Sequence, residues 1–204
     1  MDFRESLQVK DCTRNNDEYY KVYDKNGTFI KDIDVKDEGK IRDGYLKGVT
    51  CFVINENNEV LIETRAKTKL TPGKKDLVSG HVNGKELSIQ AMKRELAEEV
   101  GINVSTDKIC VAGKMPLGFT SRGTIRNFFI TFCYIKVKKP KLVCQEEEVK
   151  SFEWVPIEEA FSMIRSGKTK FPMQGNGVDY EKIFSTVRDA CTECSHRKIE
   201  KDLV

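Results

Sequence analysis

The architecture of this chain can be read from one segment, Gly80-His-Val-Asn-Gly-Lys-Glu-Leu-Ser-Ile-Gln-Ala-Met-Lys-Arg-Glu-Leu-Ala-Glu-Glu-Val-Gly-Ile102. Its pattern is Gly-x5-Glu-x7-Arg-Glu-Leu-x-Glu-Glu-x-Gly-Ile, with nine residues at fixed spacing. Glu95, Glu98 and Glu99 fall at positions i, i+3 and i+4, so a helix would place their carboxylates on one face. The pattern therefore predicts a helix with an acidic face.

This acidic face is unfavourable for a bare helix. Like-charge pairs at this spacing cost roughly 0.2–0.5 kcal/mol each. Gly101 is expected to end the helix, which puts the carboxylates in its last two turns, where the helix dipole favours cations. A divalent cation with oxygen ligands, Mg²⁺ above all, would remove both penalties. A solvated charged face is the alternative, and the acidic cluster alone does not decide between the two.

With all nine positions in place, the stretch resembles the Nudix box. The resemblance implies an α/β fold, an α/β/α sandwich with a mixed β-sheet, in which the box forms a loop–helix–loop. It implies metal ligation by Glu95, Glu98 and Glu99 with the main-chain carbonyl of Gly80, and Mg²⁺ or Mn²⁺ as the cofactor. The substrate would be a nucleoside diphosphate linked to another moiety. Arg94 and Glu86 are expected to be a structural pair that holds the loop against the helix.

The implied chemistry is hydrolysis of the diphosphate linkage. Divalent cations neutralise phosphate charge, acidify a bound water and align its attack. A carboxylate then accepts the proton of that water. The catalytic candidates are Glu95, Glu98 and Glu99 of the box, together with a glutamate from a later acidic loop. That loop holds Glu146, Glu147 and Glu148, of which Glu147 is our representative choice; a solvated loop charge is the alternative for each.

A basic strip between the second expected hairpin and the box is the candidate substrate-binding segment. Arg65 is expected to bind phosphate through two parallel hydrogen bonds from its guanidinium. Lys69 and Lys67 are expected to bind it as point charges. An ordinary basic loop is the competing interpretation. Phe119 and Arg122, in an expected loop at Leu117–Gly123, are weaker candidates for contacts with a base or a phosphate.

Composition bounds the remaining function classes. The 204 residues carry a net charge of only +3, which gives no reason to expect nucleic-acid or membrane binding as the main function. The N-terminus lacks the apolar core of a signal peptide, and no run reaches the ~18–20 apolar residues of a membrane span. Seven scattered cysteines favour reduced thiols. We therefore expect a cytoplasmic protein whose partner is a small nucleoside diphosphate derivative. A homodimer is one possible assembly state.

The C-terminal Cys191-x-x-Cys194-x-His196 invites a zinc interpretation. Structural zinc needs four ligands, and the chain has neither a second Cys-x-x-Cys nor a suitable further histidine. An amphipathic helix that carries thiols is the favoured alternative.

Hydrophobic periodicity and turn residues predict one main domain with terminal additions. Residues 1–18 are a loose lead-in, 19–176 the Nudix domain with an N-terminal hairpin, and 177–204 a helical extension. The hairpin is expected at Tyr19–Tyr23 and Thr28–Val35, because Asn26-Gly27 suits a tight turn. Further strands are expected at Val49–Ile54, Glu59–Thr64, Lys108–Lys114, Asn127–Val137 and Ser151–Val155. Helices are expected at Leu87–Val100, Ile157–Ser166 and about Tyr180–Thr192.

Outside the box, the hairpin and the spacing from Arg65 through Pro72-Gly73 to Gly80-His81 look like the isopentenyl-diphosphate isomerase-like branch of the family. That branch holds isomerases as well as hydrolases, so an isomerase is the enzymatic alternative. Isomerases carry a cysteine where this chain has Ser79, a far weaker acid, and commonly a degraded box. A non-catalytic nucleotide sensor is a third class. The identity of the diphosphate substrate stays open.

Overall fold

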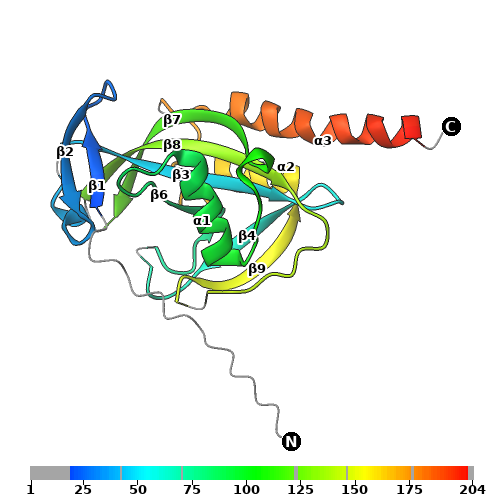
Figure 1. Ribbon diagram of the computed structural model, residues 1–204, viewed down its shortest axis with the longest axis horizontal. Coiled ribbons are helices and arrows are strands. Elements are labelled where there is room, and N and C mark those ends of the chain that lie inside the picture. Colours follow the sequence, from blue (N-terminus) through cyan, green and yellow to red (C-terminus); the bar gives the residue numbers. More distant parts are fainter. Residues whose placement is uncertain are drawn as a thin grey trace, which may run out of the picture.

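The computed structural model describes residues 19–41, 43–69, 71–121, 124–145, 147–175 and 177–201, without the side chains of 121, 124 and 193–201. In this part of the chain, nine strands form one mixed sheet (Figure 1). Their bounds are β1 Tyr19–Tyr23, β2 Phe29–Asp34, β3 Tyr45–Ile54, β4 Glu59–Arg65, β5 Lys75–Asp76, β6 Val78–His81, β7 Cys110–Ser121, β8 Thr124–Lys136 and β9 Val149–Pro156.

Strand β3 is the centre of the sheet. It runs parallel to β8 along ten residue pairs, from Tyr45↔Asn127 to Ile54↔Lys136, and antiparallel to β6. Other strands pair with β3 on both sides. A strand that is covered on both faces has a continuous apolar sequence, and the residues Val49–Ile54 of β3 are all buried. Strand β4 leaves β3 after a single residue pair and continues antiparallel to β9.

Helices cover both faces of the sheet. On one face lies α1 (Ser88–Val100), which buries Ala91, Met92, Leu96 and Val100 against β3 and β8. On the other lie α2 (Ile157–Arg165) and α3 (Glu181–Lys201), whose core contributions include Phe161 and Phe184. Two short 3-10 helices, η1 (Val35–Lys40) and η2 (Thr106–Lys108), lie in connections. The three layers confirm the predicted α/β/α sandwich with a mixed sheet.

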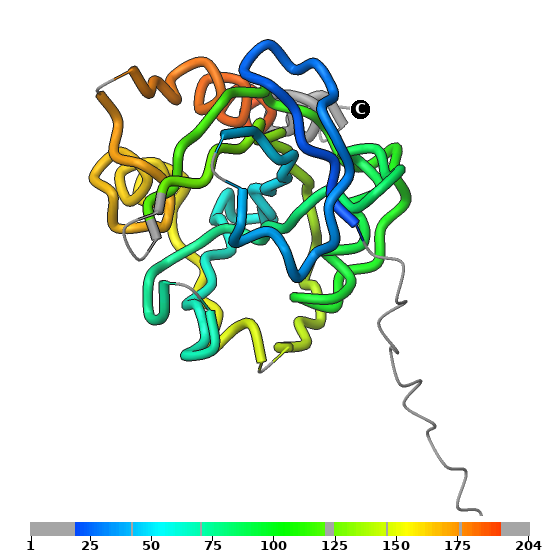
Figure 2. Tube along the Cα trace, turned by 90° about the vertical axis from the view of Figure 1, so that its left-hand side faces the viewer, coloured from blue at the N-terminus to red at the C-terminus, as the bar shows by residue number. Residues whose placement is uncertain are grey.

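The predicted N-terminal hairpin is confirmed, with Gly27 at φ +83° in its turn. Figure 2, seen at right angles to Figure 1, shows this hairpin in blue at one end of the domain. A C-terminal helix is also confirmed, and it begins at Glu181. Among the described helices, none combines the length and the apolar character needed to cross a membrane.

Three local expectations were wrong. The described part of the expected loop Leu117–Gly123 is strand, because β7 continues to Ser121 and pairs with β8 through Leu117↔Phe128 and Phe119↔Arg126. The short strands β5 and β6 were not expected. The box helix is expected from Leu87 but begins at Ser88, because Leu87 is its N-cap residue, which is 68% exposed and precedes the first turn.

Candidate metal and diphosphate site

The box begins where β6 leads into the loop before α1. Successive residues of a strand face opposite sides of the sheet, and Gly80 faces α1. A Cβ atom on Gly80 would overlap the carboxylate of Glu95, so only glycine lets the helix approach this closely. At the other end, Gly101 takes a left-handed conformation, φ +72°, and ends the helix as expected.

Arg94 joins the box loop to the box helix. Its Nε donates to Glu86 Oε1 at 2.9 Å, and its Nη2 donates to the backbone carbonyl of His81 at 3.0 Å. The predicted Arg94–Glu86 structural pair is therefore present. The same guanidinium also lies 2.7 Å from Glu95 Oε1 and 3.1 Å from Glu98 Oε2, so Arg94 partly neutralises the acidic face.

The three box glutamates differ in burial. Glu99 is 3% exposed and Glu95 is 8% exposed, whereas the Glu98 side chain is 48% exposed. Burial raises the pKa of Glu95 to about 7, since desolvation outweighs the contact with Arg94 that Glu95 shares with Glu86 and Glu98. Burial, with the nearby charges of Glu63 and Glu95, raises the pKa of Glu99 well above its ordinary value. Two of the three carboxylates are thus buried without enough positive charge to hold them ionised.

The acidic loop contributes Glu148 to this cluster. Burial opposes the charge on Glu148, but an ion pair with Lys69 and a hydrogen bond with Glu99 lower its pKa. Glu147 is exposed, and its backbone carbonyl accepts a hydrogen bond from Thr68. Glu146 lies outside the described residues. Of the predicted loop glutamates that the structure describes, Glu148 is the one adjacent to the box.

Two buried acids that the sequence analysis missed lie beneath the box. Glu63 on β4 and Asp76 on β5 are a residue pair of the sheet, 2% and 0% exposed. Burial and the charge of Asp76 raise the pKa of Glu63 to about 8, and its buried Oε2 has no hydrogen-bond partner among the described residues. Glu63 directly follows the apolar run Val60–Ile62, and a carboxylate at such a position is a signal that was available in the sequence.

Arg65 and Lys170 balance the charge of Asp76. The Arg65 Nη1 lies 2.6 Å from Asp76 Oδ2, and the Lys170 Nζ lies 2.7 Å from the same oxygen. The Lys170 ammonium also donates to the hydroxyl of Ser79, whose backbone N–H donates to Glu99 Oε2 at 3.0 Å. The predicted substrate-binding cations Arg65 and Lys69 therefore each engage a carboxylate beside the box.

The weaker candidate Phe119 packs against aromatic rings of the core. Phe119 is on β7, with its ring 5.5 Å from Phe128 and 6.1 Å from Phe171. Arg122 and the side chains of Cys194 and His196 lie outside the described residues. Cys191 is buried in the core beside α3 residues, as an amphipathic helix requires.

The residues present fit a hard divalent cation. Carboxylate and carbonyl oxygens are its preferred ligands, and Gly80, Glu95, Glu98 and Glu99 supply them from one loop–helix unit. A cation would also compensate the buried carboxylates whose pKa values are raised. In the part of the chain that the structure describes, no three acidic, histidine or cysteine side chains converge into a closed ligand cage as they stand. Glu95 and Glu98 contact Arg94 instead, and a metal held by these two carboxylates would displace it.

The sequence model of the NUDIX domain family matches residues 44–173 of this chain, which include the whole site described above. The chain belongs to the NUDIX family. Two curated relatives agree: Nudix hydrolase 3 of Arabidopsis thaliana is 29% identical over 92% of this chain, and Nudix hydrolase 2 of the same plant is 31% identical over 55%. The alignments cover 26% and 39% of those relatives, so the chain spans well under half of their length.

Solved structures share the Nudix fold. A protein of Deinococcus radiodurans matches 84% of this chain and 98% of its own with a TM-score of 0.57 and 20% identity. A MutT protein from Methanosarcina mazei Go1 matches 72% and 94% with a TM-score of 0.52 and 22% identity. The NUDIX domain of Shewanella oneidensis NrtR, complexed with ADP ribose, matches 78% and 93% with a TM-score of 0.51 and 14% identity.

Proposed function

We propose that this Nudix protein is a metal-dependent hydrolase that cleaves the diphosphate linkage of a nucleoside diphosphate joined to another moiety. The observation that carries the proposal is the group of buried carboxylates around Gly80, where Glu95, Glu99 and Glu63 all have raised pKa values. Such a group is costly to keep charged in a metal-free protein. It becomes favourable when a divalent cation and its anionic substrate bind there.

Glu95, Glu98, Glu99 and the Gly80 carbonyl would hold Mg²⁺ or Mn²⁺, which when bound supplies charge neutralisation at the phosphate oxygens and acidifies a water. Water attacks one phosphorus atom, and the bond from that phosphorus to the bridging oxygen breaks. The proton of the water passes to a carboxylate. Glu148 suits this role because its pKa is lowered, so that it is ionised, and it lies against Glu99.

The cations of the site suit phosphate binding. Lys69 and Arg65 lie at the end of β4, each paired with a carboxylate that a phosphate group could replace. Relatives of similar fold support a nucleotide-type substrate: one was solved with ADP ribose, and another is named dihydroneopterin triphosphate pyrophosphohydrolase of E. coli. Cytoplasmic residence and a homodimer stay predictions.

A panel of diphosphate compounds in water labelled with oxygen-18 tests the proposal. The panel holds nucleoside triphosphates, nucleotide sugars, ADP-ribose, dinucleoside polyphosphates and isopentenyl diphosphate, each with and without Mg²⁺. We expect a Mg²⁺-dependent product that has gained labelled oxygen. A rearranged isopentenyl diphosphate without label identifies the isomerase, and inertness across the panel with retained binding identifies the sensor.

Glu98→Gln is the matching variant, because Glu98 is exposed and its loss spares the core. We expect about 10²-fold lower turnover. Glu159→Gln is the control, since Glu159 is an exposed glutamate on α2, across the sheet from the box. Equal activity of the two variants would contradict the role assigned to Glu98.

A further inference from the structure

The segment before the family match makes direct contacts with the box. Strands β1 and β2 and the 3-10 helix η1, residues 19–40, are called the N-terminal element here, and the NUDIX match begins only at residue 44. The N–H of Gly84, in the loop before α1, donates to the Tyr19 carbonyl at 2.7 Å. The Tyr20 ring stacks on the His81 ring with centroids 4.7 Å apart and planes at 18°. The N-terminal element therefore holds the box loop at two points.

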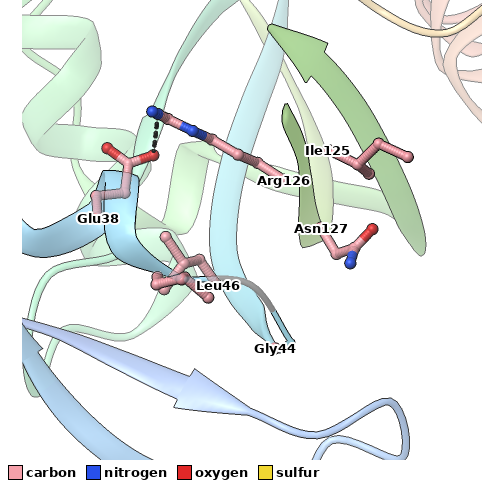
Figure 3. Close-up of a pocket in the computed structure, with 7 residues that line it drawn as sticks. Glu38, Gly44, Leu46, Ile125, Arg126 and Asn127 are labelled. Carbon is pink, nitrogen blue, oxygen red and sulfur yellow. Dashed lines mark hydrogen bonds and ion pairs between the residues drawn. The ribbon is translucent and has the colours of Figure 1, made fainter. Parts of the chain in front are cut away.

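Glu38 on η1 provides a third contact. Its Oε1 lies 2.9 Å from Arg126 Nη1 on β8 and 3.4 Å from His81 Nε2 (Figure 3 shows the pair with Arg126). The two contacts together lower the pKa of Glu38 although burial opposes its charge. The carboxylate is thus ionised and lies between a strand of the sheet and the box loop.

This carboxylate ties η1 to the sheet, beside the packing of Val35 against the core. None of the residues of η1 is fully buried. Beneath the Glu38–Arg126 pair lies a small cavity of about 10 Å³, lined in part by Leu46 and Ile125, with room for about one water (Figure 3). The charge contacts of Glu38 therefore help to fix the position of η1 over β8, together with the apolar contacts of Val35 and Ile41.

His81 is the point where these contacts reach the metal site. Its backbone carbonyl accepts from Arg94, and its ring is bounded by Tyr20, by the edge of Phe128 at 5.3 Å and by Glu38. Gly80, which precedes it, is held on β6 by pairing with Val49 of β3. The link from His81 to the box glutamates is Arg94, which the His81 carbonyl holds and which contacts Glu95 and Glu98.

We propose that Glu38 is a positioning residue of the Nudix site, which fixes the His81 ring and, through the His81 carbonyl, the Arg94 side chain that contacts the metal-ligand candidates Glu95 and Glu98. The inference rests on the proposed function, because it requires that the site binds a divalent metal, but it does not depend on which substrate is cleaved. It extends the working site beyond residues 44–173 to the N-terminal element.

The contact is tested first in the metal-free protein. The chain has two histidines, His81 and His196, so the imidazole signals in the NMR spectrum are assigned with a single His196→Gln variant. In Glu38→Gln we expect the His81 signals to shift and broaden, because the ring loses the adjacent negative charge. Asp37→Asn is the matched control: it removes the same charge from η1, but Asp37 pairs with Lys40 at 2.6 Å. Unchanged His81 signals in a folded Glu38→Gln protein overturn the inference.

Binding of Mn²⁺ without substrate, followed by electron paramagnetic resonance, tests the consequence. We expect about a tenfold rise in the dissociation constant for Glu38→Gln, as for other residues that orient ligands, and none for Asp37→Asn. Glu38→Asp, which keeps the charge but shortens its reach, should fall between. Circular dichroism shows that each variant is folded, and Glu38→Asp serves alone if the glutamine variant is not. If wild type and folded Glu38 variants bind Mn²⁺ with the same dissociation constant, the inference about Glu38 is wrong and the proposed function stands. If the wild type binds no Mn²⁺, the proposed function is wrong as well.

Discussion

The ammonium of Lys170 lies 2.7 Å from the carboxylate of Asp76, although Lys170 follows α2 and Asp76 precedes the box. Backbone pairing brings them together, because the N–H of Lys170 donates to the Lys75 carbonyl at 3.0 Å and Thr169 bridges to Lys75. The segment after α2 thus does more than link two helices. In the described part of the chain, this segment places the Lys170 ammonium beside the buried acids Glu63 and Asp76, at the edge of the sheet next to the box.

Lys170→Met should therefore destabilise the protein. Asp76 is 0% exposed and would keep only Arg65 as its cation. Loss of a hydrogen bond to a buried charge predicts a decrease of about 2 kcal/mol in the free energy of unfolding, measured by urea denaturation. The control is Lys168→Met, which removes an exposed lysine from the same segment. Equal stability of the two variants would mean that Arg65 alone suffices for Asp76.

Gly80→Ala should abolish most activity. The added Cβ would overlap the Glu95 carboxylate, so the Glu95 side chain or the backbone beside it must move. Displacement of a ligand by even 1 Å costs about 10²-fold in rate, and we expect a loss of that size in turnover at saturating Mg²⁺. Gly118→Ala on β7 is the control, since its Cβ would meet no atom closer than 3.4 Å. Full activity in Gly80→Ala would show that the close approach is not needed.

Glu148→Gln and Glu147→Gln separate the two loop candidates for the general base. Glu148 contacts Glu99 and Lys69, whereas Glu147 is exposed. Loss of a general base typically lowers the rate by about 10²–10⁴-fold, and we expect an effect in this range for Glu148→Gln alone. Single-turnover rates at saturating Mg²⁺ provide the measurement. The reverse result would restore Glu147, our choice from the sequence, as the base.

The loop–helix of the box could be predicted from the sequence because its determinants are local. Helical spacing places Glu95, Glu98 and Glu99 together, and Gly101 ends the helix. Their unequal burial could not be predicted in this way. It depends on β6 and the acidic loop, which cover Glu95 and Glu99 and leave Glu98 at the surface.

The contributions of Lys170 and Glu38 were also beyond the sequence. Each reaches the box through pairing between segments that are distant along the chain, Lys170 with β5 and Glu38 with β8. Asp76 and Glu63 are different, because an acidic residue within or next to an apolar strand already signals a buried charge that needs a partner. Attention to such residues would have extended the predicted site to the sheet.

The raised pKa of Glu95 predicts how stability depends on pH and metal. An acid whose pKa is raised to about 7 by folding binds its proton more tightly in the folded state, so the metal-free protein should lose stability as pH rises from about 4.5 to 7. The shift of the Glu95 pKa from 4.5 corresponds to about 3 kcal/mol of stability in this interval.

Mg²⁺ should reverse the loss of stability, since it stabilises the ionised carboxylates. Glu95→Gln should flatten the pH dependence, whereas Glu159→Gln should not. Thermal unfolding between pH 5 and about 8, with Mg²⁺ and with a chelator, measures each case, and a metal-free protein that gains stability across this range would refute the charge imbalance on which the site rests.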